Sequence, residues 1–183
     1  MIPAIVTPSI GRASLEQLAK HAAALHVPHL VVFDTDELPE VAGRLPDETM
    51  VYMLRRPDSA YGAAQRDWAI KHLVDLGICD VICFIDDDDD FLDEGIEAIR
   101  ALPKDTALHI FPMVKNDDVY GLSQLEDLGA IGGSMVVVPA IPDLPLWSAD
   151  NTYYHDHTFY INCKKLLGEP RWHRKCLAKV MLV

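Results

Sequence analysis

Short apolar runs, each long enough for one β-strand, alternate with segments of helical periodicity through the first hundred residues of this chain. The early runs are continuous rather than alternating between apolar and polar residues, which is typical of parallel strands buried on both faces. The expected strands are residues 4–6, 30–33, 51–54, 81–85, 108–114 and 135–138. Strands that alternate with helices fold as right-handed β-α-β units. The sequence therefore predicts an α/β fold with a mostly parallel central sheet flanked by helices.

Three helices are expected between the early strands. Ser14 and Gln17 form a capping box in front of the first helix. The second ends at Gly77, and Asp93 is expected to cap a third helix that stops at Pro103. After residue 103 the pattern is less regular, and prolines punctuate it until the end of the chain becomes helical again. With 183 residues, half of them apolar, we expect one domain with one sizeable core.

The charge balance excludes one class of function. The chain carries 28 acidic against 16 basic side chains, a formal net charge of −12. A nucleic-acid-binding protein that neutralises phosphates needs a basic face, so this class is disfavoured. The last twenty residues are by contrast basic. Two interpretations remain open for them: a solvated basic helix, or side chains that bind an anion near a metal.

The cysteines and the N-terminus indicate a compartment. The four cysteines form no C-x-x-C motif, and a chain of this size needs no disulfides, so reduced thiols are expected. The N-terminus lacks a basic segment followed by a long apolar one, and no apolar run is long enough to span a bilayer. We therefore expect a cytoplasmic protein without a membrane span.

Five consecutive carboxylates, Asp86–Asp90, follow directly on the strand predicted at residues 81–85. Such neighbours repel one another, and a divalent cation removes that penalty. In an extended chain Asp86 and Asp88 project to the same side, whereas Asp87 is expected to point to solvent. Hard oxygen ligands suit Mg2+, Mn2+ or Ca2+. A solvated acidic loop is one alternative, and an EF-hand is excluded because Phe91 stands where that loop needs glycine.

Other polar or turn-forming residues also follow predicted strands. They are Thr7, Pro8, Ser9, Asp34 and Arg55. In open α/β sheets, ligands bind beyond the carboxyl ends of the strands. We therefore expect the binding site where these residues and the aspartates meet.

With these landmarks the chain resembles the GT-A glycosyltransferases, in particular the inverting family 2. Residues 5–12 and 31–34 are similar to the nucleotide-binding start of that family, residues 61–67 to its helix start, and residues 85–88 to its D-x-D element. The resemblance implies a metal, Mn2+ or Mg2+, held by Asp86 and Asp88, with His173 as a further candidate ligand. A surface histidine in a basic helix is the alternative for His173. The implied contacts to a nucleotide-sugar donor are Thr7, Pro8, Ser9, Arg12, Asp34, Arg66, Asp86 and Asp87.

The second half of the chain resembles the acceptor side of that family. His155–Asp156 stands where the family has an acid pair at the start of a helix, and Gly132–Gly133 is similar to its small-residue turn. The resemblance makes Asp156 the general base, whereas the residue type alone also allows a helix N-cap. His155 and His157 lack a third ligand for zinc.

These observations predict a metal-dependent glycosyltransferase. It would move a sugar from a nucleotide-sugar donor to an acceptor hydroxyl, with inversion. Residues 1–103 would form the nucleotide-binding half of one GT-A-like domain, and residues 104–183 a compact acceptor-binding half. The alternatives are a nucleotidyltransferase on a related fold and a non-catalytic Ca2+- or nucleotide-binding module.

Overall fold

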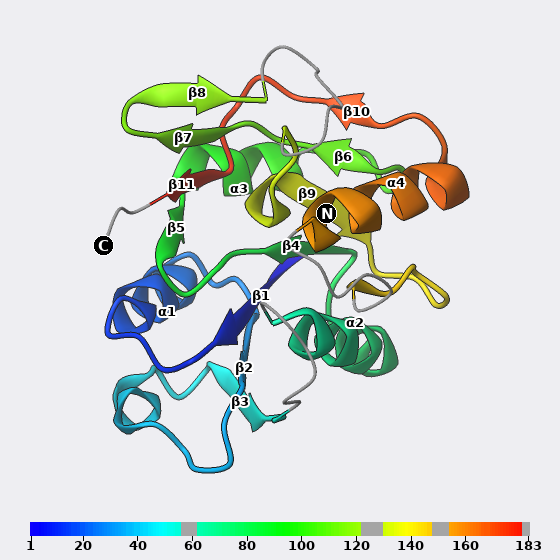
Figure 1. Cartoon of the computed structure of the whole chain (residues 1–183). Helices are drawn as coiled ribbons and strands as arrows, with labels where there is room; N and C mark the ends of the chain where they lie inside the picture. Colours follow the sequence, from blue (N-terminus) through cyan, green and yellow to red (C-terminus); the bar gives the residue numbers. More distant parts are fainter. Residues whose placement is uncertain (56–61, 122–129, 148–153, 181–183) are drawn as a thin grey trace.

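A computed structural model describes residues 1–55, 62–121, 130–147 and 154–180. Its centre is a seven-stranded sheet in the order β10-β6-β9-β4-β1-β2-β3 (Figure 1). Only β9 runs antiparallel to its neighbours β4 and β6. The strands are β1 (Pro3–Ser9), β2 (His29–Phe33), β3 (Met50–Met53), β4 (Val81–Phe84), β6 (His109–Ile110), β9 (Val136–Pro139) and β10 (Arg171–Trp172). The expected mostly parallel central sheet is confirmed.

Helices cover both faces of this sheet (Figure 1). Val6 and Phe84 face one core, which contains apolar residues of α2 (Ala63–Leu76) and α4 (His155–Leu167). Their strand neighbours Ile5 and Cys83 face the other core, with α1 (Leu15–Ala24) and α3 (Asp93–Arg100). Two short 3-10 helices, η1 (Glu40–Arg44) and η2 (Gly133–Met135), complete the described helices. Both strands are buried along their whole length, and the alternating direction of their side chains sorts these into two layers of core.

A second, four-stranded sheet has the order β5-β11-β7-β8. Its strands are β5 (Asp89–Phe91), β7 (Met113–Lys115), β8 (Asp118–Tyr120) and β11 (Ala178–Val180). The expectation of a helical, basic C-terminal end is therefore wrong beyond α4, because residues 171–172 and 178–180 are strands. The run expected at 108–114 is two strands, separated at Phe111–Pro112 where a proline cannot donate to a ladder.

Two helix starts differ from expectation. Ser14 does not cap α1 with its side chain; its hydroxyl donates to the carbonyl of Asp87 at 2.6 Å. Asp93 lies in the first turn of α3 behind the N-cap Leu92, and its carboxylate lies 2.5 Å from Nε2 of His21. The end of α2 is as expected, since Gly77 adopts a left-handed conformation and donates to the carbonyls of Leu73 and Val74. Ser14 therefore joins the aspartate run to the start of α1, and Asp93 joins α3 to α1.

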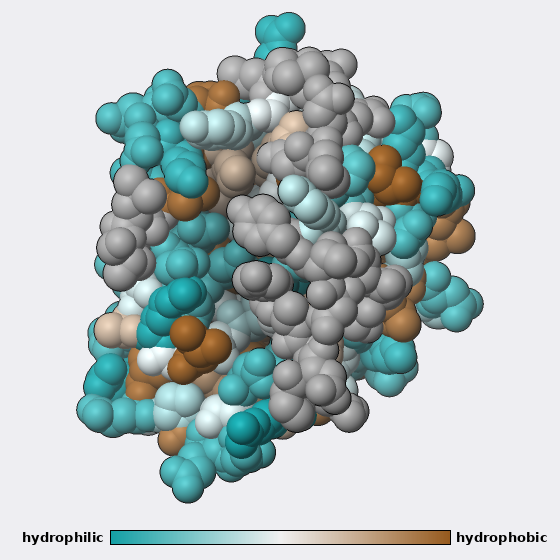
Figure 2. Space-filling view, viewed as in Figure 1, coloured by the Kyte–Doolittle hydropathy of each residue, from teal (hydrophilic) through white to brown (hydrophobic). Residues whose placement is uncertain are grey.

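The surface in the same view is mainly hydrophilic, with apolar residues in small separate groups (Figure 2). Such scattered exposure is ordinary for a globular protein. Among the described residues, no helix combines the length and the apolar character that crossing a membrane requires.

Candidate functional site

A cavity of about 410 Å³ opens at the carboxyl ends of β1, β2 and β4. It brings together most of the residues that the sequence nominated for donor binding. Its lining consists of Pro8, Ser9, Ile10, Arg12, Asp34, Gly62, Asp86, Asp87 and Asp88. Thr7 is not among them: it is fully buried, and its Oγ1 lies 2.9 Å from Nε2 of His29. A larger hollow of about 540 Å³ lies between α2 and residues 141–146, away from the aspartate run.

Asp87 is a buried side chain that binds the loop after β1, rather than a solvated one. Its Oδ2 accepts hydrogen bonds from the Ser9 hydroxyl at 2.7 Å and the Ile10 amide at 3.1 Å. Its Oδ1 lies 2.6 Å from a guanidinium nitrogen of Arg12, and the residue is 3% exposed. The expectation that Asp87 points to solvent is wrong, because β4 ends at Phe84 and the chain turns at Asp87. The side-chain alternation of an extended strand therefore does not apply here.

Asp87→Asn should lower the free energy of unfolding by about 2 kcal/mol or more, since hydrogen bonds to a buried charged group contribute about 1.5–3 kcal/mol. Urea unfolding of the ligand-free protein measures this change. Asp118→Asn, which removes an exposed carboxylate on β8, is the matched control and should stay close to the native value. Equal stability of the two variants would show that Asp87 does not hold the loop after β1.

Asp86 and Asp88 face the cavity with partly exposed side chains, 42% and 33% of their surface. Asp86 forms an ion pair with Arg66, and Oδ2 of Asp88 lies 3.0 Å from Arg12. Burial raises the pKa of Asp86; Arg66 opposes this, while Asp156, Asp88 and Asp87 raise the pKa further. An added cation at Asp86 would relieve the repulsion among these carboxylates.

The pair fits a divalent cation only if the substrate supplies further ligands. Among the described residues, no three His, Cys, Asp or Glu side chains come together in a group that could hold a metal ion. Mg2+ is commonly bound by one or two carboxylates together with waters and substrate phosphates. Asp86 and Asp88 provide such a pair at the cavity wall. The donor set thus suits a hard cation that binds together with a diphosphate.

His173 and the last two aspartates lie in other surroundings. His173 stacks on Phe111, and its Nε2 lies 3.0 Å from Nδ1 of His109. Burial, with His109 and Arg171 nearby, lowers the pKa of His173 to about 4. Asp89 contacts the Ser134 hydroxyl, and Asp90 accepts from the Phe91 amide and pairs with His21. His173 follows β10 rather than lying in the basic helix that the sequence suggested.

Asp156 lies in the first turn of α4, whose N-cap is Tyr154. Its Oδ2 accepts a hydrogen bond from the Gly133 amide at 3.0 Å, and its Oδ1 lies 3.1 Å from Nε2 of His155. Burial would raise the pKa of Asp156, but His155, Arg66 and the Gly133 amide outweigh it and hold that pKa below its usual range. The N-cap alternative is therefore replaced by a carboxylate bound to the glycine turn, ionised at neutral pH.

The charge of Arg66 lowers the pKa of Asp156, and the ion-pair partner of Arg66 lines the cavity. Arg66 is 2% exposed, pairs with Asp86, and its guanidinium lies 4.7 Å from the centre of the Trp147 ring. The Trp147 amide donates to Asp67 at 2.6 Å. The sequence gives no sign of this contact, because no local pattern joins residues 80 positions apart. Tyr61 of the expected helix-start motif lies outside the described residues.

Comparison with known proteins places the fold. No protein-family model and no curated protein sequence matches this chain. Over its whole length the chain matches TarS from S. aureus with a TM-score of 0.76 at 13% identity, and spans 37% of that protein. It matches a glycosyltransferase involved in glycosylation of the major capsid of PBCV-1 with a TM-score of 0.55 at 11% identity, over 100% of this chain and 95% of the other.

A third match is a putative glucose-1-phosphate thymidylyltransferase from Bacillus anthracis, with a TM-score of 0.57 at 8% identity, over 96% of this chain and 87% of that one. The chain thus spans little more than a third of TarS but nearly all of the other two. At these identities the likeness is one of fold. This chain has the fold of the GT-A-type nucleotide-diphospho-sugar transferases.

Proposed function

We propose that this protein is a glycosyltransferase that moves a sugar, such as a hexose, from a nucleotide-sugar donor to an acceptor hydroxyl, with inversion. The observation that carries the proposal is the placement of two groups of carboxylates. Asp86, Asp87 and Asp88 line the cavity at the carboxyl ends of the strands, and Asp156 lies near enough to raise the pKa of Asp86. A leaving-group site and a candidate base therefore share one region of the fold.

The donor would occupy the cavity. Asp34 stands at the end of β2 in the cavity wall, where a carboxylate accepts hydrogen bonds from a base or a ribose. Arg12, which lies between Asp87 and Asp88, would contact the phosphates. Asp86 and Asp88 would hold Mn2+ or Mg2+, which when bound stabilises the charge that develops on the departing diphosphate.

The acceptor hydroxyl would meet Asp156. The residue is ionised at neutral pH, as a general base must be before it takes a proton. Its second oxygen is fixed by the Gly133 amide, so the carboxylate is oriented before substrate arrives. Inversion follows from direct attack by the acceptor on the sugar carbon, opposite the leaving diphosphate.

A thermal-shift panel of nucleoside diphosphates and nucleotide sugars, with and without Mn2+, tests the donor half of the proposal. One nucleotide at about a hundred times its dissociation constant should stabilise the metal-loaded protein by about 2.7 kcal/mol. For a chain of this length the melting temperature should rise by about 5 °C or more. An unselective response, or a shift that survives a chelator, would contradict the metal–diphosphate site.

A nucleotidyltransferase is the second candidate, because one structural match is a putative thymidylyltransferase. That chemistry releases pyrophosphate from a nucleoside triphosphate, whereas sugar transfer releases a nucleoside diphosphate. The loop after β1 carries one glycine, Gly11, where we would expect a glycine-rich phosphate loop. Product analysis separates the two candidates: pyrophosphate formed from a nucleoside triphosphate and a sugar phosphate would favour the second.

A further inference from the structure

We propose that Arg66 is a positioning residue for both halves of the site: it holds Asp86 at the donor cavity and, across the indole of Trp147, sets the electrostatic environment of Asp156. This inference rests on the proposed function and goes beyond a role for Arg66 in donor binding alone. Three sets of contacts carry it.

The first set places Arg66 beside Asp86, which lines the cavity. Arg66 lies in the first turn of α2, is 2% exposed and forms an ion pair with Asp86. A Cβ added to Gly62 would lie 3.5 Å from Arg66 Nη1 and 2.5 Å from Cβ of Pro8. Gly62 also has a left-handed backbone with φ of +72°. A side chain at position 62 would clash with Pro8, so the glycine lets the start of α2 lie against the loop after β1.

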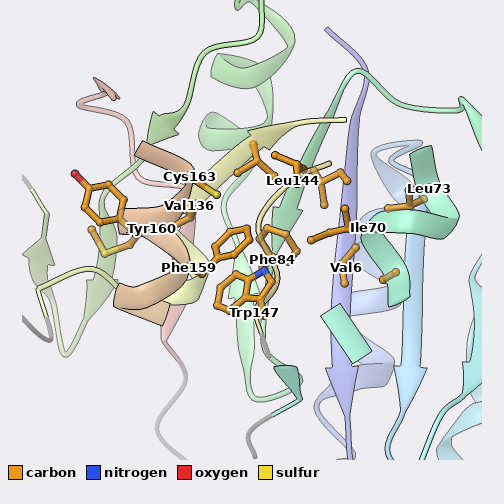
Figure 3. Close-up of a cluster of buried hydrophobic side chains, with 14 of the residues drawn as sticks. Val6, Ile70, Leu73, Phe84, Val136, Leu144, Trp147, Phe159, Tyr160 and Cys163 are labelled. Atoms are coloured by element: carbon orange, nitrogen blue, oxygen red, sulfur yellow. The ribbon is translucent and has the colours of Figure 1, made fainter. Parts of the chain in front are cut away.

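The second set fixes the surface on which Arg66 rests. Its guanidinium lies 4.7 Å from the Trp147 ring centre, where the face of the indole attracts a cation. The next residue of α2, Asp67, accepts the Trp147 amide at 2.6 Å. The indole also packs against Phe84 and Phe159, with ring centroids 5.0 and 4.1 Å away (Figure 3). Two consecutive residues of α2 therefore hold Trp147 by its ring and by its backbone.

The third set joins Trp147 to Asp156. A Cβ added to Gly133 would lie 3.3 Å from Oδ1 of Asp156 and 3.4 Å from Cη2 of Trp147, so both side chains lie beside the same glycine. The Trp147 ring also lies 5.9 Å from the ring of His155. Arg66, Trp147, His155 and Asp156 therefore form one continuous set of contacts that ends at the candidate base.

The charges that face Asp156 come from three elements. His155 lies beside it on α4, Arg66 on α2 and Asp86 after β4, while the Gly133 amide approaches from η2. Burial would raise the pKa of Asp156, and His155, Arg66 and the amide lower it. Removing the Arg66 charge should therefore raise the pKa of Asp156 and, at the same time, free Asp86 from its partner.

The test measures the titration of Asp156 directly. In metal-free protein, the carboxyl carbon signal of Asp156, assigned by its loss in Asp156→Asn, is followed by NMR against pH. The midpoint should rise by about one pH unit or more in Arg66→Met, because an opposite charge nearby shifts a carboxyl pKa by about 1–3 units. Arg66→Lys, which keeps the charge, should return it to near the native value.

The same variants are then compared in sugar transfer. The acid limb of the kcat/KM profile should move up with the NMR midpoint in Arg66→Met, and donor KM should rise in both Arg66 variants. Arg44→Met, which removes an exposed arginine paired with Glu16 and Glu40, is the matched control and should change neither value.

If the midpoint of the Asp156 titration in Arg66→Met equals that of the native protein, the inference is overturned. If Arg66→Met does not fold, Arg66→Gln takes its place. If neither variant folds, Arg66→Lys decides: a changed midpoint of the Asp156 titration would overturn the inference, and an unchanged midpoint supports it. Failure of the native protein to transfer sugar would instead count against the proposed function, and the NMR midpoint would still decide the role of Arg66.

Discussion

Replacing Asp156 with asparagine should lower sugar transfer about a hundredfold or more while leaving nucleotide affinity nearly unchanged, since a general base contributes about 10²–10⁴ in rate. Asparagine keeps the size of the side chain and one oxygen for the Gly133 amide. It cannot accept the proton of an acceptor hydroxyl in the transition state, so the loss should fall on kcat. Steady-state kinetics with a proven acceptor, together with nucleotide titrations, measure both quantities.

Asp143→Asn is the control for this substitution. Asp143 is exposed and has φ of +64°, a backbone conformation that asparagine also adopts readily. The Asp143→Asn variant should keep native kinetics of sugar transfer. Native transfer by Asp156→Asn would show that another group takes the proton. A large fall in melting temperature in that variant would instead show that Asp156 mainly holds the Gly133 turn.

The central sheet could be predicted because each of its main buried strands corresponds to one continuous apolar run in the sequence. The continuous apolar runs at 4–6, 30–33 and 81–85 lie in or overlap β1, β2 and β4, which are buried along their whole length. The strands β5, β8 and β11 are three residues each and carry charged residues. The strands β5 and β11 exist through pairing between segments far apart, such as Ala178 with Phe91, which no local pattern reports. The strand β8 instead pairs with β7 across the short turn at Asn116 and Asp117.

The candidate site, like the fold, could be predicted only in part: its location could, but the roles of its residues could not. The aspartate run at the end of β4 located the cavity, because parallel strands end at one edge of a sheet. The roles within the run could not be read from strand alternation, since Asp87 lies in a turn and is held by Ser9, Ile10 and Arg12. The contacts of Arg66 with Trp147 and of Asp156 with Gly133 join separate elements, so only the structure shows them.

Asp88→Asn should weaken metal-dependent nucleotide binding by about a hundredfold or more. A neutral amide is a poorer ligand for a hard cation than a carboxylate, and even outer-shell changes at metal sites cost about 10–100-fold in affinity. The fold should survive, because Arg12 keeps its ion pair with Asp87 at 2.6 Å when the Asp88 carboxylate is replaced by an amide. Stability without metal should therefore stay near the native value, in contrast to Asp87→Asn.

Asp90→Asn is the control for this substitution, because Asp90 belongs to the same run but is absent from the cavity lining and contacts His21 and Phe91 instead. Calorimetric titration of a nucleoside diphosphate with Mn2+, and again with a chelator, measures the effect. If Asp88→Asn and Asp90→Asn lose the same affinity, the run acts through its total charge rather than through ligands at Asp86 and Asp88. If Asp88→Asn alone loses affinity, and only when Mn2+ is present, the cavity-facing carboxylate contributes to nucleotide binding through the metal.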